Sequence, residues 1–374
     1  MKLVVDENIP FGSRFFERFG EVQALPGREL SPEQVRDADI LIVRSVTKVG
    51  EYLLSGSKVK FVGTCTIGID HLDTEYLKRN HIAYASAPGC NAGGVVQYDL
   101  AALSQLQPDW RQKRVGVVGC GNVGGRLCKT LNALGVQYVV YDPFLTKVDN
   151  AHLTSLDEVL DCDVVCMHTP YTTAGPHPTH HLLNANNLSR LRPGTILLNA
   201  GRGGAIDNQA LLTHLQQGAD LRVVLDVWEH EPQVDLALME HVQLASPHIA
   251  GYSFEGKMNG SAMIYQELVN YLDLDASVFD EQLRRLLDKL RGAPQTVHCD
   301  SFSDALAATY DIGADDQRFR HALTAAAPNG IGAAFDLLRK TYPERREFSH
   351  FNAATADTGL RKTLFNIGFL IDDE

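Results

Sequence analysis

The sequence predicts an α/β fold with two doubly wound parallel-sheet lobes and a C-terminal α+β domain, on three observations. Near-continuous apolar runs alternate with helical stretches through most of the chain, which is typical of parallel sheets covered on both faces. A glycine-rich turn lies between an apolar strand and a helix within residues 114–143. The alternation stops near residue 285, and the 374 residues are enough for roughly two and a half domains.

The first ninety residues predict a substrate-binding lobe of the flavodoxin-like type. Strands are expected at residues 2–7, 38–45, 59–66 and 82–88, with helices at 31–38 and 73–80 between them. Ser31 followed by Pro32 is a good helix start, because serine caps and proline tolerates the first turn. A later helix with an apolar stripe, 260–272, indicates that the chain returns to this lobe. We therefore expect residues 1–93 and 256–284 to form it together.

Residues 94–255 predict a nucleotide-binding lobe of the Rossmann type. A helical stretch at 94–106 is followed by one strand–helix–strand unit within 114–143, as a dinucleotide-binding fold requires. Further strands are expected at 163–168, 194–200, 221–228 and 242–248. The remaining residues, 285–374, are expected to be a helix-rich domain with one or two strands and enough apolar residues for a core or an interface.

The glycine-rich turn has the spacing of a dinucleotide site. Gly119 permits the tight turn, Gly121 lets the backbone approach a pyrophosphate, and Gly124 lets the helix pack close to the sheet. The start of that helix offers backbone N–H groups to the phosphates. Asp142 ends the next strand, where its carboxylate can accept bonds from the ribose and would repel a 2′-phosphate. NAD is therefore the expected cofactor.

Three polar residues follow expected strands of the same lobe, and their chemistry is complementary. His248 can exchange a proton near neutral pH, Glu231 can orient the imidazole, and Arg202 can grip a substrate carboxylate. Ligands of open α/β sheets bind outside the carboxyl ends of the strands, so we expect the three to converge there. Oxidation of a 2-hydroxy acid needs such a base and such an anchor beside a nicotinamide.

Composition excludes several other classes. The formal charge is -12, from 34 basic and 46 acidic residues, which makes the chain a poor non-specific binder of nucleic acid. The N-terminus has no signal-peptide layout and no run of about 18 apolar residues occurs, so neither secretion nor a membrane span is expected. Seven irregularly spaced cysteines favour reduced thiols in the cytoplasm.

Three blocks, NAGRGG (199–204), DVWEHEP (226–232) and SPHIAG (246–251), resemble signatures of the D-isomer-specific 2-hydroxyacid dehydrogenase family. The resemblance covers about residues 1–275 and includes HTP (168–170). It implies an NAD-dependent dehydrogenase in which the family's Arg, Glu and His fall on Arg202, Glu231 and His248. In addition to the glycine motif, it implies NAD contacts at Asn122, Val123, Asp142, Thr169, Ala200, Asp226 and Gly251.

VDENIPF (5–11), LPGRE (25–29) and RSVTKV (44–49), with the C-terminal tail, resemble more closely the 4-phosphoerythronate dehydrogenase family of pyridoxine 5′-phosphate synthesis. This resemblance implies a phosphorylated 2-hydroxy acid as substrate and a homodimer formed through residues 285–374. It implies substrate contacts at Ser45, Thr66 and Tyr252. Thr64 is an alternative to Thr66, because GTCTIGID (63–70) is a loosely constrained motif.

The roles of two groups of basic residues stay open, as do two alternative functions. Arg44 and Lys48 flank Ser45 and could hold the substrate phosphate. HPTHH (177–181) resembles a metal-binding tract, but no carboxylate or cysteine completes it, so a loop or packing role and no metal site are expected. The alternative functions are another dehydrogenase of the family, acting on phosphoglycerate, glycerate or lactate, and a non-catalytic NAD-sensing scaffold.

Overall fold

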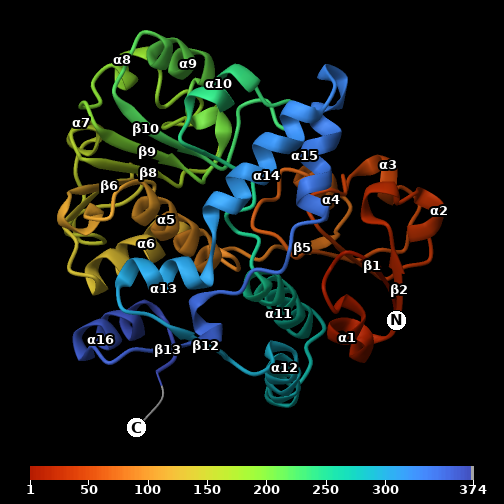
Figure 1. Cartoon of the computed structure of the whole chain (residues 1–374). Coiled ribbons are helices and arrows are strands. Elements are labelled where there is room, and N and C mark those ends of the chain that lie inside the picture. Colours follow the sequence, from red (N-terminus) through yellow and green to blue (C-terminus); the bar gives the residue numbers. More distant parts are fainter. Residues whose placement is uncertain (372–374) are drawn as a thin grey trace. The chain divides into compact units, whose positions relative to one another are not determined.

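The computed structural model describes residues 1–371 and divides the chain into two compact units (Figure 1). Unit 1 consists of residues 1–91 and 253–293, and unit 2 of residues 92–252 with the chain from 294 onward. The expected boundary between 284 and 285 falls inside helix α12 (Ala276–Arg291), which belongs to unit 1. The C-terminal segment groups with the nucleotide-binding sheet, so its standing as a third domain stays a prediction.

Unit 1 is built on a parallel sheet of five strands in the order β2-β1-β3-β4-β5, one of the two common doubly wound orders. The strands are β1 (Lys2–Asp6), β2 (Glu21–Leu25), β3 (Ile40–Val43), β4 (Phe61–Thr64) and β5 (Ala83–Ala85). Sequence analysis missed β2. This edge strand has no buried residue, so it lacks the apolar run that revealed the others.

Helices cover both faces of this sheet. They are α1 (Gly12–Phe16), α2 (Pro32–Val35), α3 (Glu51–Leu54), α4 (Thr74–Arg79), α11 (Phe254–Tyr271) and α12. One core joins Leu3 and Val5 to Ile264 and Leu268 of α11. The other lies under α2, α3 and α4 and includes Leu41. The expected return of the chain to this unit is therefore present, through two helices rather than one.

Unit 2 contains a parallel sheet of six strands in the order β11-β10-β9-β8-β6-β7. The strands are β6 (Val115–Val118), β7 (Tyr138–Tyr141), β8 (Val164–Met167), β9 (Thr195–Asn199), β10 (Leu221–Leu225) and β11 (Leu244–Ala245). The chain goes from β6 outward to β7 and returns to β8 on the other side of β6. This reversal is a topological switch point, where dinucleotides bind in such sheets.

The helices around this sheet enclose two buried cores. They are α5 (Ala92–Leu106), α6 (Asn122–Ala133), α7 (Leu156–Leu160), α8 (Ala185–Leu188), α9 (Asn208–Gln216) and α10 (Leu236–His241). The core under α5 and α6 includes Tyr98 and Leu127. The core on the other face of the sheet includes Leu211 and Leu238. The loops that carry polar residues therefore emerge from a rigid, fully covered sheet.

Between residues 294 and 371, the C-terminal segment forms a two-stranded parallel sheet and four α-helices. These are β12 (Gln295–His298), α13 (Phe302–Thr309), α14 (Ile312–Ala325), α15 (Ile331–Lys340), β13 (Phe351–Ala354) and α16 (Thr358–Ile367). Figure 1 shows α13 beside α5, and Phe302 joins the core beneath that helix. Phe319 and Phe335 join the core on the other face. The segment is thus an integral part of unit 2.

Two further properties bear on the expectations from composition. None of the helices within residues 1–371 is long and apolar enough to span a membrane. The seven cysteines all lie in the described part of the chain and are free thiols, and five of them are buried.

The packing of α15 leads to a prediction about stability. Phe335 is fully buried, so Phe335→Ala should lower the free energy of unfolding by about 3–5 kcal/mol through lost burial and a cavity. Leu337 lies on the same helix but is 58% exposed, so Leu337→Ala should change it by less than about 0.5 kcal/mol. Urea unfolding followed by tryptophan fluorescence measures both, since Trp110 and Trp228 belong to unit 2. Equal losses of unfolding free energy in the two variants would mean that the core around Phe335 does not stabilise the C-terminal segment.

Candidate active site

The glycine-rich turn has the backbone geometry that its sequence requires. Gly119 has a φ of +88°, a left-handed conformation that favours glycine, and it follows β6 directly. A side chain at Gly124 would place its Cβ 1.9 Å from the carbonyl oxygen of Gly119, so only glycine lets α6 approach the turn this closely. A Cβ at Gly121 would meet no atom of the described chain within 4 Å, which leaves room for a ligand.

Asp142 and Thr169 stand at the two sides of this turn. The Asp142 carboxylate accepts hydrogen bonds from the backbone N–H of Cys120 (2.9 Å) and of Phe144 (3.0 Å), which fix it at the end of β7. Thr169 is buried beside Gly119, and its hydroxyl has no hydrogen-bond partner within residues 1–371. An anchored carboxylate and an unpaired hydroxyl around an open turn fit NAD, which these residues and the start of α6 would hold.

Arg202 follows β9 in a loop that is braced from within. The fully buried Asn199 accepts a bond from the N–H of Gly201 (3.0 Å) and donates to the carbonyl oxygen of Arg202 (3.0 Å). A Cβ at Gly203 would lie 2.0 Å from the carbonyl group of Trp228. The glycine therefore lets the loop after β9 touch the loop after β10, and the part-exposed Arg202 is set beside the strand that leads to Glu231.

His248 and Glu231 form a hydrogen-bonded pair. His248 Nδ1 lies 2.7 Å from Glu231 Oε2, and the other carboxylate oxygen accepts a bond from the N–H of Trp228 (2.9 Å). Their side chains are 32% and 22% exposed. Burial raises the pKa of Glu231, but His248, its hydrogen bonds and the charge of Arg339 outweigh burial, so the pKa lies below the ordinary value. Glu231 therefore stays ionised and can stabilise a protonated imidazole.

Asp226 holds the loop that carries His248. Its buried carboxylate accepts bonds from the Ser246 hydroxyl (2.6 Å) and from the N–H groups of Ile249 (2.7 Å) and Ala250 (2.9 Å). These bonds draw the chain out of the sheet, which explains why β11 ends at Ala245 instead of reaching residue 248. An NAD contact for Asp226 stays a prediction. The structure adds a positioning role that the motif did not reveal.

A second buried pair lies beneath the glycine turn. Asp99 of α5 and His168, which follows β8, are both almost fully buried, and their Oδ2 and Nε2 atoms are 3.1 Å apart. Burial raises the pKa of Asp99, while the neighbouring histidine lowers it. Sequence analysis missed this pair, although His168 belongs to the HTP block. Only the fold brings α5 against β8.

The remaining NAD and substrate residues of unit 2 lie on the expected loops. Asn122 and Val123 begin α6, Ala200 follows β9, and Gly251 and Tyr252 follow the His248 loop. The guanidinium of Arg339, on α15, lies 5.3 Å from the ring centroid of Tyr252. Sequence analysis missed this arginine, because nothing in the sequence links α15 to that loop. The ligand contacts of all five loop residues stay predictions.

The expected substrate residues of unit 1 differ in accessibility. Ser45 is exposed, whereas Arg44 donates from Nε to the buried carboxylate of Asp6 over 3.0 Å. Thr64 is fully buried and pairs with His71 and with Thr66. Thr66 is only partly buried, so between these two threonines it is the one a ligand can reach.

The fold and the site of unit 2 define an NAD-binding dehydrogenase of the D-2-hydroxyacid type. Residues 96–250 match the family model of the D-isomer specific 2-hydroxyacid dehydrogenase NAD binding domain, and residues 287–368 match a domain of unknown function (DUF3410). A solved structure of NAD-bound 3-phosphoglycerate dehydrogenase from Entamoeba histolytica, 25% identical, aligns with a TM-score of 0.61. The alignment covers 73% of this chain and 95% of that one.

Curated relatives extend the similarity over the whole length. The erythronate-4-phosphate dehydrogenase of Saccharophagus degradans is 50% identical over 374 residues, which cover 99% of each chain. That of Pseudomonas putida (strain GB-1) is 49% identical over 359 residues, 93% of each chain. The chain therefore belongs to the erythronate-4-phosphate dehydrogenase family.

The lowered pKa of Glu231 predicts how stability depends on pH. A carboxylate whose pKa is lower in the folded state adds stability above its ordinary pKa of 4.5, and this contribution is lost as the pH falls through the folded value. Glu231→Gln removes the titration. Urea unfolding at several pH values should therefore show the stability advantage of the wild type over this variant shrinking below pH 4.5. A pH-independent difference would contradict the assignment.

Proposed function

We propose that the chain oxidises the C2 hydroxyl of 4-phospho-D-erythronate with NAD and yields 2-oxo-3-hydroxy-4-phosphobutanoate, in pyridoxine 5′-phosphate synthesis. The 2.7 Å bond between His248 and Glu231, on loops from adjacent strands of an NAD-binding sheet, carries the proposal. Relatives named for this substrate at 50% identity support its identity.

His248 acts as the base. Its Nδ1 donates to the ionised Glu231, so the unprotonated Nε2 takes the proton of the substrate hydroxyl. Glu231 stabilises the imidazolium that results, and the Trp228 N–H keeps the carboxylate turned toward the ring. NAD, when bound, supplies the hydride acceptor. In the reverse direction the imidazolium of His248 returns the proton to the oxygen.

Arg202 binds the substrate carboxylate in this proposal. Its Nη1 donates to the carbonyl oxygen of Gly201 (2.9 Å), which orients the guanidinium while leaving other N–H groups for a ligand. A planar fork of donors suits a carboxylate better than the point charge of a lysine. The anchor would fix the C2 carbon relative to His248, and such positioning accounts for a large part of many rate enhancements.

Ser45, Thr66 and Tyr252 contact the substrate in this proposal, with Arg44 and Lys48 as cations for the phosphate. Arg44 already forms an ion pair with Asp6, so the positive charge of its guanidinium is partly neutralised within unit 1. Lys48 is exposed. We therefore expect hydroxyl groups and both cations to hold the phosphate together. Arg44 should contribute less to phosphate binding than the sequence implies.

The chain forms a homodimer through its C-terminal segment in this proposal. Phe365 is 64% exposed and Leu370 is 40% exposed, and both lie at or after α16. Exposed large apolar side chains close together in sequence are typical of protein interfaces. The family resemblance supports the same segment as the dimer contact.

Turnover with a matched pair of substrates tests the proposed reaction. The protein with NAD should oxidise 4-phosphoerythronate and should oxidise unphosphorylated erythronate, phosphoglycerate, glycerate and lactate far more slowly. His248→Asn should lower kcat by about 10³-fold or more, because the base is lost, while NADH fluorescence titration shows little change in cofactor affinity. Faster turnover of another acid would show that the proposed substrate is wrong. A His248→Asn enzyme that stays active would show that His248 is not the base.

The oligomeric state tests the proposed interface. Phe365→Glu places a charge on the exposed face of α16 and should convert a dimer into a monomer in sedimentation equilibrium. Val148→Glu is the matched control, because Val148 is 97% exposed in a loop far from this segment in sequence. A monomeric wild type, or a Phe365→Glu protein that stays dimeric, would refute this interface.

A further inference from the structure

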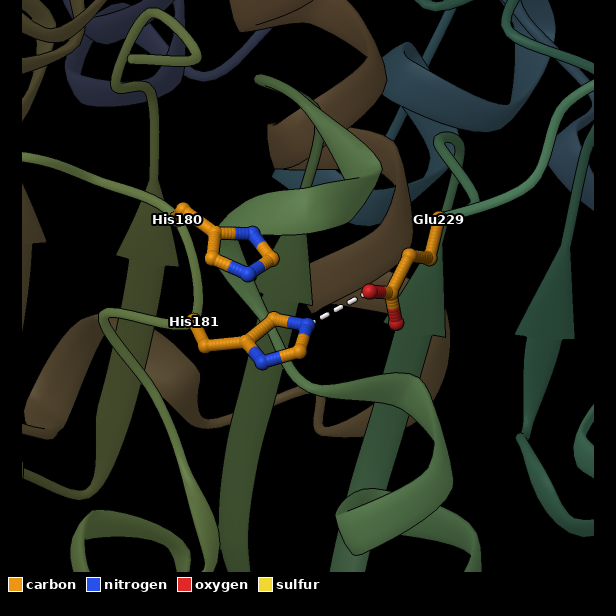
Figure 2. Close-up of side chains that lie close together, drawn as sticks. All are labelled: His180, His181 and Glu229. Atoms are coloured by element: carbon orange, nitrogen blue, oxygen red, sulfur yellow. Dashed lines mark hydrogen bonds and ion pairs between the residues drawn. The ribbon is translucent and has the colours of Figure 1, made fainter. Parts of the chain in front are cut away.

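Two histidines and a carboxylate meet where the loops after β8 and β10 come together (Figure 2). His180 and His181 end the HPTHH tract, and Glu229 lies 48 residues beyond His181. One donor atom from each side chain lies within 4.8 Å of the other two. Sequence analysis rejected a metal site because no carboxylate completed the tract. The fold supplies that carboxylate from a distant loop.

His181 is oriented as a metal-binding histidine would be. Its Nε2 lies 2.5 Å from Glu229 Oε1, and its Nδ1 lies 3.7 Å from a carboxylate oxygen of Asp207. The usual outer partner of a metal-bound imidazole is a carboxylate that accepts a hydrogen bond from the far ring nitrogen, and Asp207 stands at ion-pair distance from that nitrogen. Glu229 is itself held, because its Oε2 accepts a bond from the N–H of Asn208 (3.1 Å).

His180 offers its remaining ring nitrogen to the same point. Its Nδ1 lies 3.1 Å from the Tyr171 hydroxyl, so Nε2 is the nitrogen that can bind an ion. The two imidazole rings stack with centroids 3.8 Å apart, and Figure 2 shows the carboxylate facing this stack.

The backbone that carries these side chains is ordered by bonds between loops. The N–H of His181 donates to the carbonyl oxygen of Gly204 (2.9 Å), and His181 has a φ of 49°, a left-handed conformation. The N–H of Glu229 donates to the Asn208 side chain (3.2 Å). The donors are therefore held in place before any ion binds. His180 is exposed, which leaves a path from solvent.

We propose that His180, His181 and Glu229 bind one zinc ion, with Asp207 as the outer partner of His181. Two imidazole nitrogens and a carboxylate oxygen suit Zn²⁺, whose ligand distances are about 2.0–2.2 Å, while Mg²⁺ and Ca²⁺ prefer oxygen alone. Binding requires the three donor atoms, now within 4.8 Å of one another, to move closer around the ion, and water takes the fourth position. The ion ties the β8 loop to the loop that leads into Glu231. It has no part in hydride transfer, so this site is independent of the proposed function.

Direct metal binding tests the site. The full-length protein, stripped of metal by a chelator, is titrated with Zn²⁺ alone against a colorimetric chelator, without NAD or substrate. We expect one ion per chain, a visible absorption band when Co²⁺ replaces Zn²⁺, and no comparable binding of Mg²⁺. Asp207→Asn should weaken binding about 10–100-fold as an outer partner, and His180→Ala and Glu229→Gln should weaken it more.

His177→Ala is the matched control. It removes an exposed histidine of the same tract that lies outside the cluster, and it should leave Zn²⁺ affinity unchanged. Circular dichroism verifies that each variant is folded, and the exposed His180 is the safest position to change. A wild type without stoichiometric Zn²⁺ would overturn the proposal, as would His180→Ala and Glu229→Gln proteins that bind like the wild type.

Discussion

The carboxylate of Asp226 imposes the constraint on which the geometry of the His248–Glu231 pair depends. It is buried at the end of β10 and accepts three hydrogen bonds from residues 246–250, while its own carbonyl oxygen accepts the N–H of His248 (2.7 Å). Burial raises the pKa of Asp226, and His248 and these bonds act in the opposite direction. The loop is thereby held with His248 at a φ of 58°, which aims the imidazole at Glu231. A buried carboxylate with every oxygen bonded leaves this loop few alternatives.

The C-terminal segment braces the same loop from the other side. Asp316 accepts the N–H of Ala245 (2.7 Å), and Arg345 donates to the carbonyl oxygens of Gly94 and Ala250. The buried guanidinium of Arg345 lies 4.4 Å from the ring centroid of Tyr310, so an aromatic face offsets part of its desolvation. A segment expected to serve as an interface thus also supports the loop that carries His248 within one chain.

Sequence reasoning succeeded where the signal is local. The apolar runs of β1, β3 and β4, the glycine turn and the pairing of His248 with Glu231 all follow from short-range patterns and from the rule for parallel sheets. It failed where a strand has no apolar run and where the residues that meet are far apart in the sequence. Strand β2 is exposed, the pairing of Asp99 with His168 needs α5 against β8, and Glu229 completes the histidine tract only across loops.

The interrupted path of unit 1 also fixes the order in which a growing chain can fold. Its core joins Leu3 and Val5 of β1 to Ile264 and Leu268 of α11, and all of unit 2 up to Tyr252 is synthesised between them. As the chain leaves the ribosome, the first sheet is complete within ninety residues, but one of its faces is covered only by Phe15, Phe16 and Phe19 until α11 and α12 emerge. The nascent chain therefore exposes the part of this face that α11 and α12 later cover while the whole nucleotide-binding sheet is synthesised. This interval is where a chaperone has most to protect.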